Sequence, residues 1–281
     1  MRYRTLQLAG GPHVVADAPD GPRLTAGGAD RTLSDLLALP AADRDAALAP
    51  GGPAPAGAGE LAPLRPSAIV CIGLNYADHV RESGMETPKR PLIFAKLPQS
   101  VIGPGEAVVI DPEVTEQVDW EVELAVVIGE TARNVPAERA LEHVFGYTVG
   151  NDVSARDLQF ADVQWVRAKS LDTFCPLGPA VVTRDEVPDP QALALRTRVN
   201  GEPVQDSSTS EMIFGVAELI AFCSRSFTLR PGDVLLTGTP WGCGAFMDPP
   251  RFLAPGDTVE TEVEGVGTLV NPVRSAVAVS A

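Results

Sequence analysis

WEVELAVVIG, residues 120–129, is the stretch from which the fold of this chain is best approached. It predicts a strand, because Val, Leu and Ile dominate and no strand-breaking residue precedes Gly129. Successive side chains of a strand point to opposite faces. One face would then carry Trp120, Val122, Leu124, Val126 and Ile128, and the other Glu121, Glu123, Ala125 and Val127. Since both faces are apolar from Leu124 onward, we expect a central strand that is buried on both sides.

Two glutamates, Glu121 and Glu123, share one face at the start of this strand. Carboxylates at the edge of a core are costly to desolvate, and like charges at this spacing repel each other. A divalent cation relieves both effects, because hard oxygen ligands suit Mg²⁺, Mn²⁺ or Ca²⁺. The E-x-E spacing alone leaves a second interpretation open, in which the strand end is exposed and both acids are solvated.

Composition and charge exclude several classes of protein. The 281 residues are 44% hydrophobic and 21% charged, which indicates a globular chain. A formal net charge of −15 argues against nucleic acid or an anionic membrane as a partner. No apolar run reaches the roughly 18 residues that span a bilayer, and the first residues lack a secretory pattern. Together with four widely spaced cysteines that predict free thiols, these features predict a cytoplasmic protein. The cysteines are Cys71, Cys175, Cys223 and Cys243.

The rest of the chain predicts a β-rich α+β protein. Residues 50–59, PGGPAPAGAG, contain strong breakers and read as a linker, so we expect a small N-terminal domain in residues 1–60. Residues 61–281 would form the second domain, with short strands, a few short helices and a hairpin at Asn200-Gly201. Neither a regular βαβ alternation nor a dinucleotide-binding G-x-G-x-x-G pattern is present.

A short helix is expected over residues 76–82, between a glycine-bearing loop and a proline-rich exit. Such a segment has few anchors and is typical of a lid that closes over a ligand. His79 and Glu82 stand three residues apart on it, which brings their side chains within contact range. The pair can act as a carboxylate-held base, or it can be an ordinary solvated pair on a helix surface.

Seven stretches together resemble the fumarylacetoacetate hydrolase family, in the order in which that family has them. They are GLNYADHVRESG (73–84), WEVELAVVIG (120–129), GYTVGNDVSARDLQ (146–159), RAKSLDTFCPLGP (167–179), VNGEPVQDSSTSEMIF (199–214), LRPGDVLLTGTPWGCG (229–244) and FLAPGDTVETEVEGVGTL (252–269). The resemblance covers roughly residues 65–272. It implies a mixed β-sandwich roll with a small N-terminal domain, usually assembled as a homodimer.

The resemblance implies one divalent metal per chain, Mg²⁺ or Mn²⁺. Its ligands would be Glu121, Glu123 and Asp152. Three carboxylates and a divalent cation leave a net charge near −1 and coordination positions for waters and substrate, which agrees with this assignment. Asp152 could instead merely cap the helix that follows it.

The remaining site residues also follow from the resemblance. Lys169 matches the family's active-site lysine, and its ammonium would stabilise negative charge on an enolate. We expect Asp172 to orient that lysine rather than to bind the metal. Gln159 and Thr239 would contact substrate oxygens, Thr239 at the substrate carboxylate. Arg156 could share this role or form a structural salt bridge.

The predicted chemistry is hydrolysis of a C–C bond in a β-diketo acid of the acylpyruvate or fumarylpyruvate type. The resemblance implies that the reaction passes through an enolate of a 2-oxo acid, which the metal stabilises. Glu82 would orient His79, His79 would activate water, and Lys169 would help to hold the pyruvate enolate. Decarboxylation of an oxaloacetate-like acid and tautomerisation of a hydroxymuconate-type acid remain alternatives. A further alternative, from another class, is a protein that only binds a small oxo acid.

Overall fold

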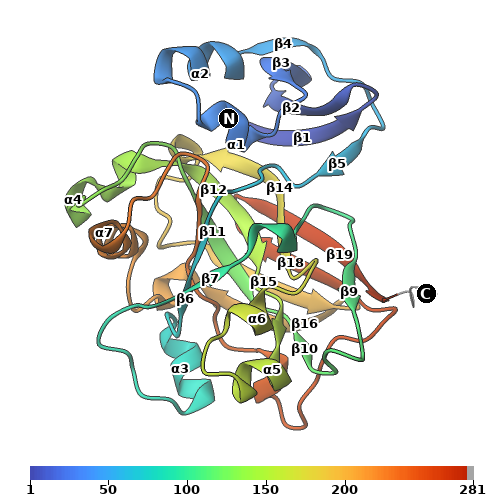
Figure 1. Ribbon diagram of the computed structural model, residues 1–281, viewed down its shortest axis with the longest axis vertical. Coiled ribbons are helices and arrows are strands. Elements are labelled where there is room, and N and C mark those ends of the chain that lie inside the picture. The colour runs from blue at the N-terminus through green and yellow to red at the C-terminus, as the bar shows by residue number, and fades with distance from the viewer. Residues whose placement is uncertain (277–281) are drawn as a thin grey trace.

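The computed structural model describes residues 1–276, so the last five residues of the predicted second domain, 61–281, lie outside the described residues. A 12-stranded mixed sheet runs through the molecule (Figure 1). Its main path is β4 (Pro50–Pro53), β3 (Gly21–Ala29), β2 (Gly11–Ala18), β1 (Arg2–Leu8), β14 (Cys175–Thr183), β12 (Val144–Asn151), β11 (Val122–Ile128), β17 (Val234–Leu236), β6 (Ile69–Gly73) and β7 (Leu92–Lys96). Beside this path, β5 (Gly59–Leu61) pairs with β1 and β8 (Val101–Ile102) pairs with β14.

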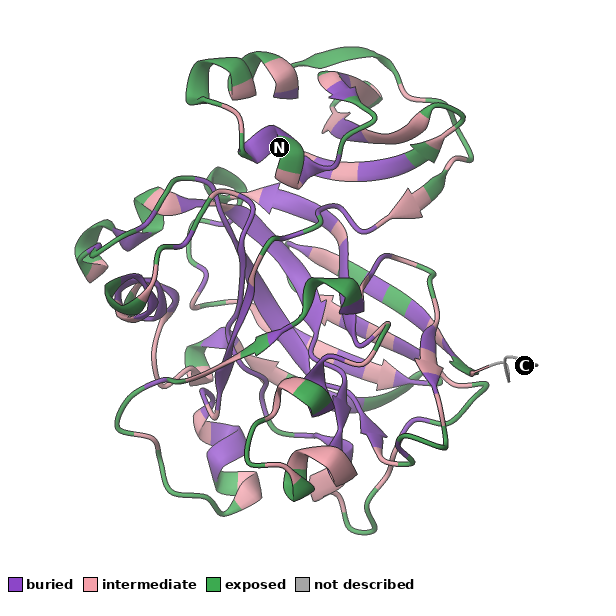
Figure 2. Cartoon of the chain, viewed as in Figure 1, coloured by how far each residue is buried: buried purple, intermediate pink, exposed green. Residues whose placement is uncertain are grey.

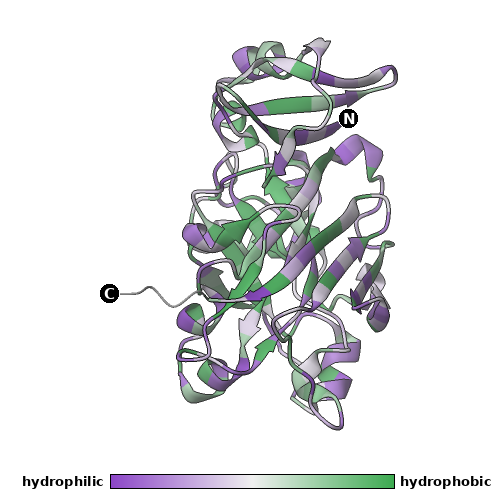
Figure 3. Ribbon diagram, turned by 90° about the vertical axis from the view of Figure 1, so that its right-hand side faces the viewer, coloured by the Kyte–Doolittle hydropathy of each residue, from purple (hydrophilic) through white to green (hydrophobic). Residues whose placement is uncertain are grey.

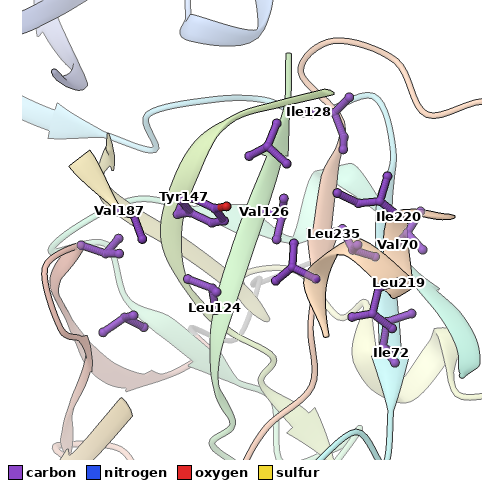
Figure 4. Close-up of a cluster of buried hydrophobic side chains, with 14 of the residues drawn as sticks. Val70, Ile72, Leu124, Val126, Ile128, Tyr147, Val187, Leu219, Ile220 and Leu235 are labelled. Atoms are coloured by element: carbon purple, nitrogen blue, oxygen red, sulfur yellow. The ribbon is translucent and has the colours of Figure 1, made fainter. Parts of the chain in front are cut away.

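β11 is the central strand, as the sequence predicts. All seven of its residues are buried, and it pairs with β12 on one side and β17 on the other. Leu124, Val126 and Ile128 point into one apolar cluster, which Figure 4 shows together with Leu219 and Ile220. Ala125 and Val127, on the opposite face, belong to a second cluster that includes side chains of the N-terminal strands. The predicted alternation is therefore confirmed.

The strand begins two residues later than predicted. Trp120 and Glu121 lie between β10 (Val118–Asp119) and β11, outside any strand. Here side-chain oxygens take the place of the backbone carbonyls of a neighbouring strand. Asn151 Oδ1 accepts the Glu121 N–H at 3.0 Å, and Gln205 Oε1 accepts the Val122 N–H at 3.0 Å. Because buried backbone groups are satisfied in this way, the chain can leave the sheet without losing hydrogen bonds.

A second sheet packs against the first and completes the sandwich. It has five strands in the order β16 (Glu202–Ser208), β15 (Ala194–Val199), β18 (Thr258–Val263), β19 (Gly267–Ser275) and β9 (Val108–Ile110). β10 forms a separate two-stranded ladder with β13 (Ser154–Ala155). Buried residues of both sheets pack into one hydrophobic cluster. Figure 2 shows that the buried segments lie mainly on the strands in the middle of the molecule. In Figure 3 the hydrophobic residues concentrate on strands in the middle of the molecule. The predicted β-rich fold is confirmed.

The helices are short and lie around the sheets. They are α1 (Leu33–Leu37), α2 (Ala41–Leu48), α3 (Ala77–Ser83), α4 (Ala137–Ala140), α5 (Arg156–Ala161), α6 (Val166–Lys169) and α7 (Val216–Ser226). Single turns of 3₁₀ helix occur at Pro98–Ser100, Leu141–His143, Arg184–Glu186, Thr209–Glu211 and Gly244–Phe246. None of the helices among residues 1–276 is long and apolar enough to cross a membrane.

The N-terminal strands are joined to the large sheet rather than set apart from it. β1 pairs with β2 and also with β14, where Arg2 is opposite Val182. The predicted linker is corrected at its two ends, because Pro50–Pro53 forms β4 and Gly59 begins β5. β4 lies at the edge of the sheet, where proline is tolerated because no neighbour needs its missing N–H. A domain boundary near residue 60 stays a prediction.

Candidate active site

Three carboxylates meet where β11 begins and β12 ends. The two strands are antiparallel with Val122 opposite Asn151, so the end of β12 brings Asp152 beside Glu121 and Glu123. One oxygen from each carboxylate lies within 4.8 Å of the others. Glu121 is 6% exposed, Glu123 1% and Asp152 0%. The interpretation of a solvated strand end is therefore wrong.

Two cations neutralise part of this cluster. Lys169, the last residue of α6, places Nζ 2.9 Å from Glu121 Oε2 and 2.8 Å from Asp152 Oδ2. Arg156, the first residue of α5, places Nη2 2.7 Å from Glu121 Oε1 and Nε 2.8 Å from Asp119 Oδ2. Arg156 therefore does form the structural ion pair that the sequence left open.

The ion pairs set the protonation states. Burial alone would raise the pKa of Glu121, but the charges of Lys169 and Arg156 outweigh it and lower that pKa to about 2. Burial likewise tends to lower the pKa of Lys169, whereas Asp152 and Glu121 raise it above its usual value. Both groups are charged at neutral pH.

Glu123 is the carboxylate that lacks a cation. Its Oε2 accepts the Gly238 N–H at 2.7 Å, and no Lys or Arg of the described residues forms an ion pair with it. Burial and then the charges of Asp152 and Glu121 raise the pKa of Glu123 well above its usual value. A divalent cation would supply the missing counter-charge. The residues present therefore fit a hard metal ion held by Glu121, Glu123 and Asp152.

Asp152 has no role as a helix cap. Its Oδ2 accepts from Lys169 and its Oδ1 from Lys96, whose Nζ lies 2.6 Å away. Asp172, which we expected to orient Lys169, is exposed, and none of the hydrogen bonds among residues 1–276 joins the two side chains. That expectation is wrong: the carboxylates of Glu121 and Asp152 orient Lys169 instead.

Lys96 is a site residue that the sequence did not reveal. It ends β7, its side chain is fully buried, and its Nζ also donates to the Val153 carbonyl at 3.1 Å. The one feature of the sequence that could have indicated this role is the position of the lysine at the end of the apolar strand LIFAK. With Lys96 included, the four carboxylates Asp119, Glu121, Glu123 and Asp152 face three cations. One divalent ion would make the whole cluster positive, which favours an anionic acid as ligand.

Replacing Lys96 with methionine is expected to lower the free energy of unfolding of the metal-free protein by about 3 kcal/mol. The change keeps the apolar stem but leaves Asp152 paired with Lys169 alone. Urea denaturation measures the effect, and Lys89→Met, on an exposed loop lysine, is the control. Equal stability of the Lys96→Met and Lys89→Met variants would contradict a charge-neutralising role for Lys96.

His79 and Glu82 form a hydrogen-bonded pair on α3. Nδ1 of His79 lies 2.9 Å from Glu82 Oε2, while Glu82 Oε1 accepts the Gly242 N–H at 2.8 Å. An ionised carboxylate can only accept, so a neutral His79 beside it would carry its proton on Nδ1 and offer Nε2 as the proton acceptor. The His79 ring also packs edge-on against Phe246, with ring centroids 5.3 Å apart. The pair is partly to fully buried and is not a solvated surface pair.

The helix that the sequence predicts to be a lid, α3, is held to the rest of the chain by hydrogen bonds and an ion pair. Asp78 accepts a hydrogen bond from Ser207 of β16, and Arg81 forms an ion pair of 3.0 Å with Glu211. Asn75, just before α3, donates from Nδ2 to the carbonyls of Thr237 and Phe214. These contacts attach the helix to two separate segments of the chain.

One cavity connects these groups. It encloses about 110 Å³ and is lined by Ile72, Gly73, Leu74, His79, Met85, Phe94, Glu121, Arg156, Gln159, Phe160, Trp165, Lys169, Thr239 and Phe246. Six of the nine residues proposed from the sequence line it, and the other three, Glu82, Glu123 and Asp152, contact those six or lie in the carboxylate cluster. Gln159 Oε1 accepts from Arg156 at 2.8 Å, and Thr239 Oγ1 accepts from Gln205 at 3.0 Å.

Known proteins share this architecture. The family model described as fumarylacetoacetate (FAA) hydrolase, C-terminal, matches residues 68–274. Oxaloacetate tautomerase Fahd2a, mitochondrial, of Rattus norvegicus is 50% identical over 215 residues, which are 76% of this chain and 68% of the relative. A fumarylacetoacetate hydrolase structure from Exiguobacterium antarcticum has a TM-score of 0.89 at 37% identity, covering 98% of this chain and all of that one. A 5-carboxymethyl-2-hydroxymuconate delta-isomerase structure from Mycobacterium smegmatis has a TM-score of 0.78 at 39% identity, covering 99% of this chain and all of that one.

The expectation of a cytoplasmic protein is overturned by these comparisons. The similar proteins of Rattus norvegicus, Bos taurus and Homo sapiens are all named as mitochondrial. The four cysteines are indeed free and buried. Reduced thiols are compatible with any reducing compartment, so the free cysteines could not distinguish the cytoplasm from the mitochondrion.

The resemblance seen in the sequence is thus supported independently in three ways. The matched segment covers most of the chain, the relatives share half of their aligned residues with it, and solved structures share its fold over nearly its whole length. The buried carboxylate cluster and the His79–Glu82 pair lie inside the matched segment. This chain belongs to the fumarylacetoacetate hydrolase family.

Proposed function

We propose that this protein is a divalent-metal-dependent tautomerase that interconverts the keto and enol forms of a small 2-oxo acid such as oxaloacetate. One observation carries the proposal: a carboxylate-held histidine lines the same small cavity as two buried cations, Arg156 and Lys169. The cavity volume of about 110 Å³ suits a small acid. The 50% identical relatives named oxaloacetate tautomerases and the isomerase of Mycobacterium smegmatis support this choice over hydrolysis.

Each residue has a role in moving one proton. Nε2 of His79 would accept the proton from C3 of the keto acid, while the electron pair of the C–H bond forms the C2=C3 double bond and the π pair of the carbonyl moves onto the C2 oxygen. Glu82 holds the ring and stabilises the imidazolium that results. Lys169 stabilises the negative charge that develops on the oxygen. The proton held by the His79 imidazolium is then returned to this oxygen, which gives the enol and restores neutral His79. Arg156, Gln159 and Thr239 would orient the substrate's carboxylate.

The metal would add to this charge stabilisation. A Mg²⁺ or Mn²⁺ ion held by Glu121, Glu123 and Asp152 would supply the positive charge that makes C3 of a 2-oxo acid more acidic. The ligand types suit both ions. The homodimer that the family resemblance implies stays a prediction, for which sedimentation analysis is the direct measurement.

Hydrolysis of an acylpyruvate is the second candidate, because a histidine held as His79 is can also activate water. Decarboxylation of oxaloacetate would use the same charge stabilisation without needing a base. These reactions differ in their products. Tautomerisation keeps the carbon skeleton, hydrolysis of acetylpyruvate gives acetate and pyruvate, and decarboxylation of oxaloacetate gives pyruvate and carbon dioxide.

The test follows three signals with Mg²⁺ and after chelation with EDTA. They are C3 proton exchange of oxaloacetate in D₂O, loss of its enol absorbance, and pyruvate formed from oxaloacetate or acetylpyruvate. Faster exchange and ketonisation that require Mg²⁺, above the enzyme-free rate, are expected. Pyruvate without accelerated exchange would favour hydrolysis or decarboxylation, and no turnover at all would reduce the protein to a binder. Glu138→Gln, an exposed change on α4, is the matched control for site variants.

A further inference from the structure

A buried amide joins the start of β11 to the loop that carries Thr239. Gln205, on β16, is 1% exposed. Its Oε1 accepts from the Val122 N–H at 3.0 Å and from the Thr197 hydroxyl at 2.8 Å. A backbone N–H can only donate, so the oxygen of the amide lies on this side. The NH₂ group of Gln205 therefore faces the loop.

This NH₂ group contacts three acceptors in the loop. Nε2 lies 3.0 Å from Thr239 Oγ1, 3.1 Å from the Pro240 carbonyl oxygen and 3.3 Å from that of Trp241. Carbonyl oxygens can only accept, which fixes the same orientation of the amide a second time. Thr239 Oγ1 therefore accepts its hydrogen bond from Gln205, and the hydrogen of the Thr239 hydroxyl points away from Gln205.

The Thr239 hydroxyl hydrogen is available to a ligand. The side chain lines the cavity, and none of the hydrogen bonds among residues 1–276 has Thr239 Oγ1 as its donor. We infer that Gln205 is a positioning residue: by donating to Thr239 Oγ1, it directs the hydroxyl hydrogen into the cavity, where it donates to an oxygen of a bound 2-oxo acid. The inference rests on the proposed function only for the class of ligand. Gln205 is not among the cavity-lining residues, so it acts through Thr239.

The loop is held against β16 by other contacts as well. Gly242 has a φ of +97° and lies so close to β16 that an added Cβ would be 2.1 Å from the Val204 carbonyl oxygen. The indole N–H of Trp241 donates to the Asp206 carbonyl at 3.1 Å. A change of the Gln205 side chain leaves both contacts in place. Its effect on ligand binding therefore reports on the Thr239 hydroxyl rather than on detachment of the loop.

The test measures how much Thr239→Val weakens the binding of oxamate at saturating Mg²⁺, with and without the Gln205 amide. Oxamate has the adjacent oxygens of a 2-oxo acid but no C3 hydrogen, so its binding is independent of turnover. In the native background Thr239→Val should raise the Kd by at least about tenfold, the effect of one hydrogen bond to a charged oxygen. In the Gln205→Met background the same change should alter the Kd by less than about twofold, because the hydroxyl is no longer directed at the ligand.

Two further backgrounds complete the cycle. Thr197→Val is the matched control, because it removes a buried hydrogen bond from the same amide and leaves the NH₂ group in place. In that background Thr239→Val should still raise the Kd by at least about tenfold. Gln205→Glu serves if the methionine variant does not fold. One carboxylate oxygen can still accept from the Val122 N–H, while the other accepts the Thr239 hydrogen and turns it away from the cavity.

Equal effects of Thr239→Val in the native and Gln205-variant backgrounds would overturn the inference, and so would a Thr239→Val protein that binds oxamate as tightly as the native chain. The C3 proton exchange of oxaloacetate in D₂O reports separately on the proposed function. If the effect of Thr239→Val depends on Gln205 but exchange is no faster than in buffer, the positioning role stands and the tautomerase proposal fails. If exchange is accelerated and the effect is the same in every background, the reverse holds.

Discussion

Replacing Glu123 with glutamine is expected to abolish Mg²⁺ and Mn²⁺ binding and to lower kcat/KM for C3 proton exchange by about 1,000-fold, equivalent to about 4 kcal/mol. Of Glu121, Glu123 and Asp152, Glu123 is the carboxylate with which no Lys or Arg of residues 1–276 forms an ion pair, so its charge is the one most dependent on the metal. Glutamine keeps the size of the side chain but weakens it as a ligand. Calorimetric titration with Mn²⁺ measures binding, and exchange kinetics measure activity.

Without metal, the Glu123→Gln change should stabilise the folded protein. Burial and two neighbouring carboxylates raise the pKa of Glu123 in the folded protein above its unfolded value. The folded state therefore holds this proton more tightly, so stability is gained as pH falls through the raised pKa and is lost again as pH rises. At neutral pH, metal-free Glu123→Gln should melt at a higher temperature than the metal-free native protein. Mg²⁺ should then raise the melting temperature of the native protein alone.

Glu138→Gln removes a charge of the same kind from the exposed surface of α4 and should retain native metal binding, activity and Mg²⁺-dependent melting. A Glu123→Gln protein that Mg²⁺ stabilises as strongly as the native chain would show that Glu123 is not a ligand.

The features that could be predicted from the sequence are those set by local geometry. The alternation of Leu124, Val126 and Ile128 with Ala125 and Val127 follows from strand geometry, and the strand is central and buried as expected. The hairpin at Asn200-Gly201 joins β15 and β16, with both residues at positive φ as such a turn requires.

Features that depend on long-range pairing were missed. Lys96 contacts Asp152, 56 residues away. Lys96 ends β7 and Asp152 follows β12, and β6, β17 and β11 lie between these two strands in the sheet. Sequence spacing does not reveal such a contact. Likewise Asp172, near Lys169 in the chain, points elsewhere, while Glu121, 48 residues from Lys169, forms its ion pair. The edge strand Pro50–Pro53 was missed for another reason: its composition indicates a loop, and only pairing with β3 makes it a strand.

Replacing His79 with asparagine is expected to lower kcat for C3 proton exchange by about 1,000-fold, within the range for removal of a general base. Metal affinity and substrate binding should stay close to native, because His79 contacts none of the three carboxylates through a hydrogen bond among the described residues. This separation distinguishes a base from a binding residue. Equal losses in Kd and kcat would contradict the assignment.

Glu82→Gln tests the protonation state of the pair more finely. The Gly242 N–H donates to Oε1, so the glutamine amide oxygen should stay there and its NH₂ group should face His79 Nδ1. Nδ1 would then have to accept, which moves the imidazole proton to Nε2 and removes the base. Activity should fall by at least about 100-fold, as it does when a carboxylate that orients a catalytic histidine becomes an amide. Glu82→Ala, which leaves Nδ1 able to keep its proton, should fall less. If Glu82→Ala is the poorer enzyme, Glu82 acts by holding the helix rather than by fixing the tautomer of His79.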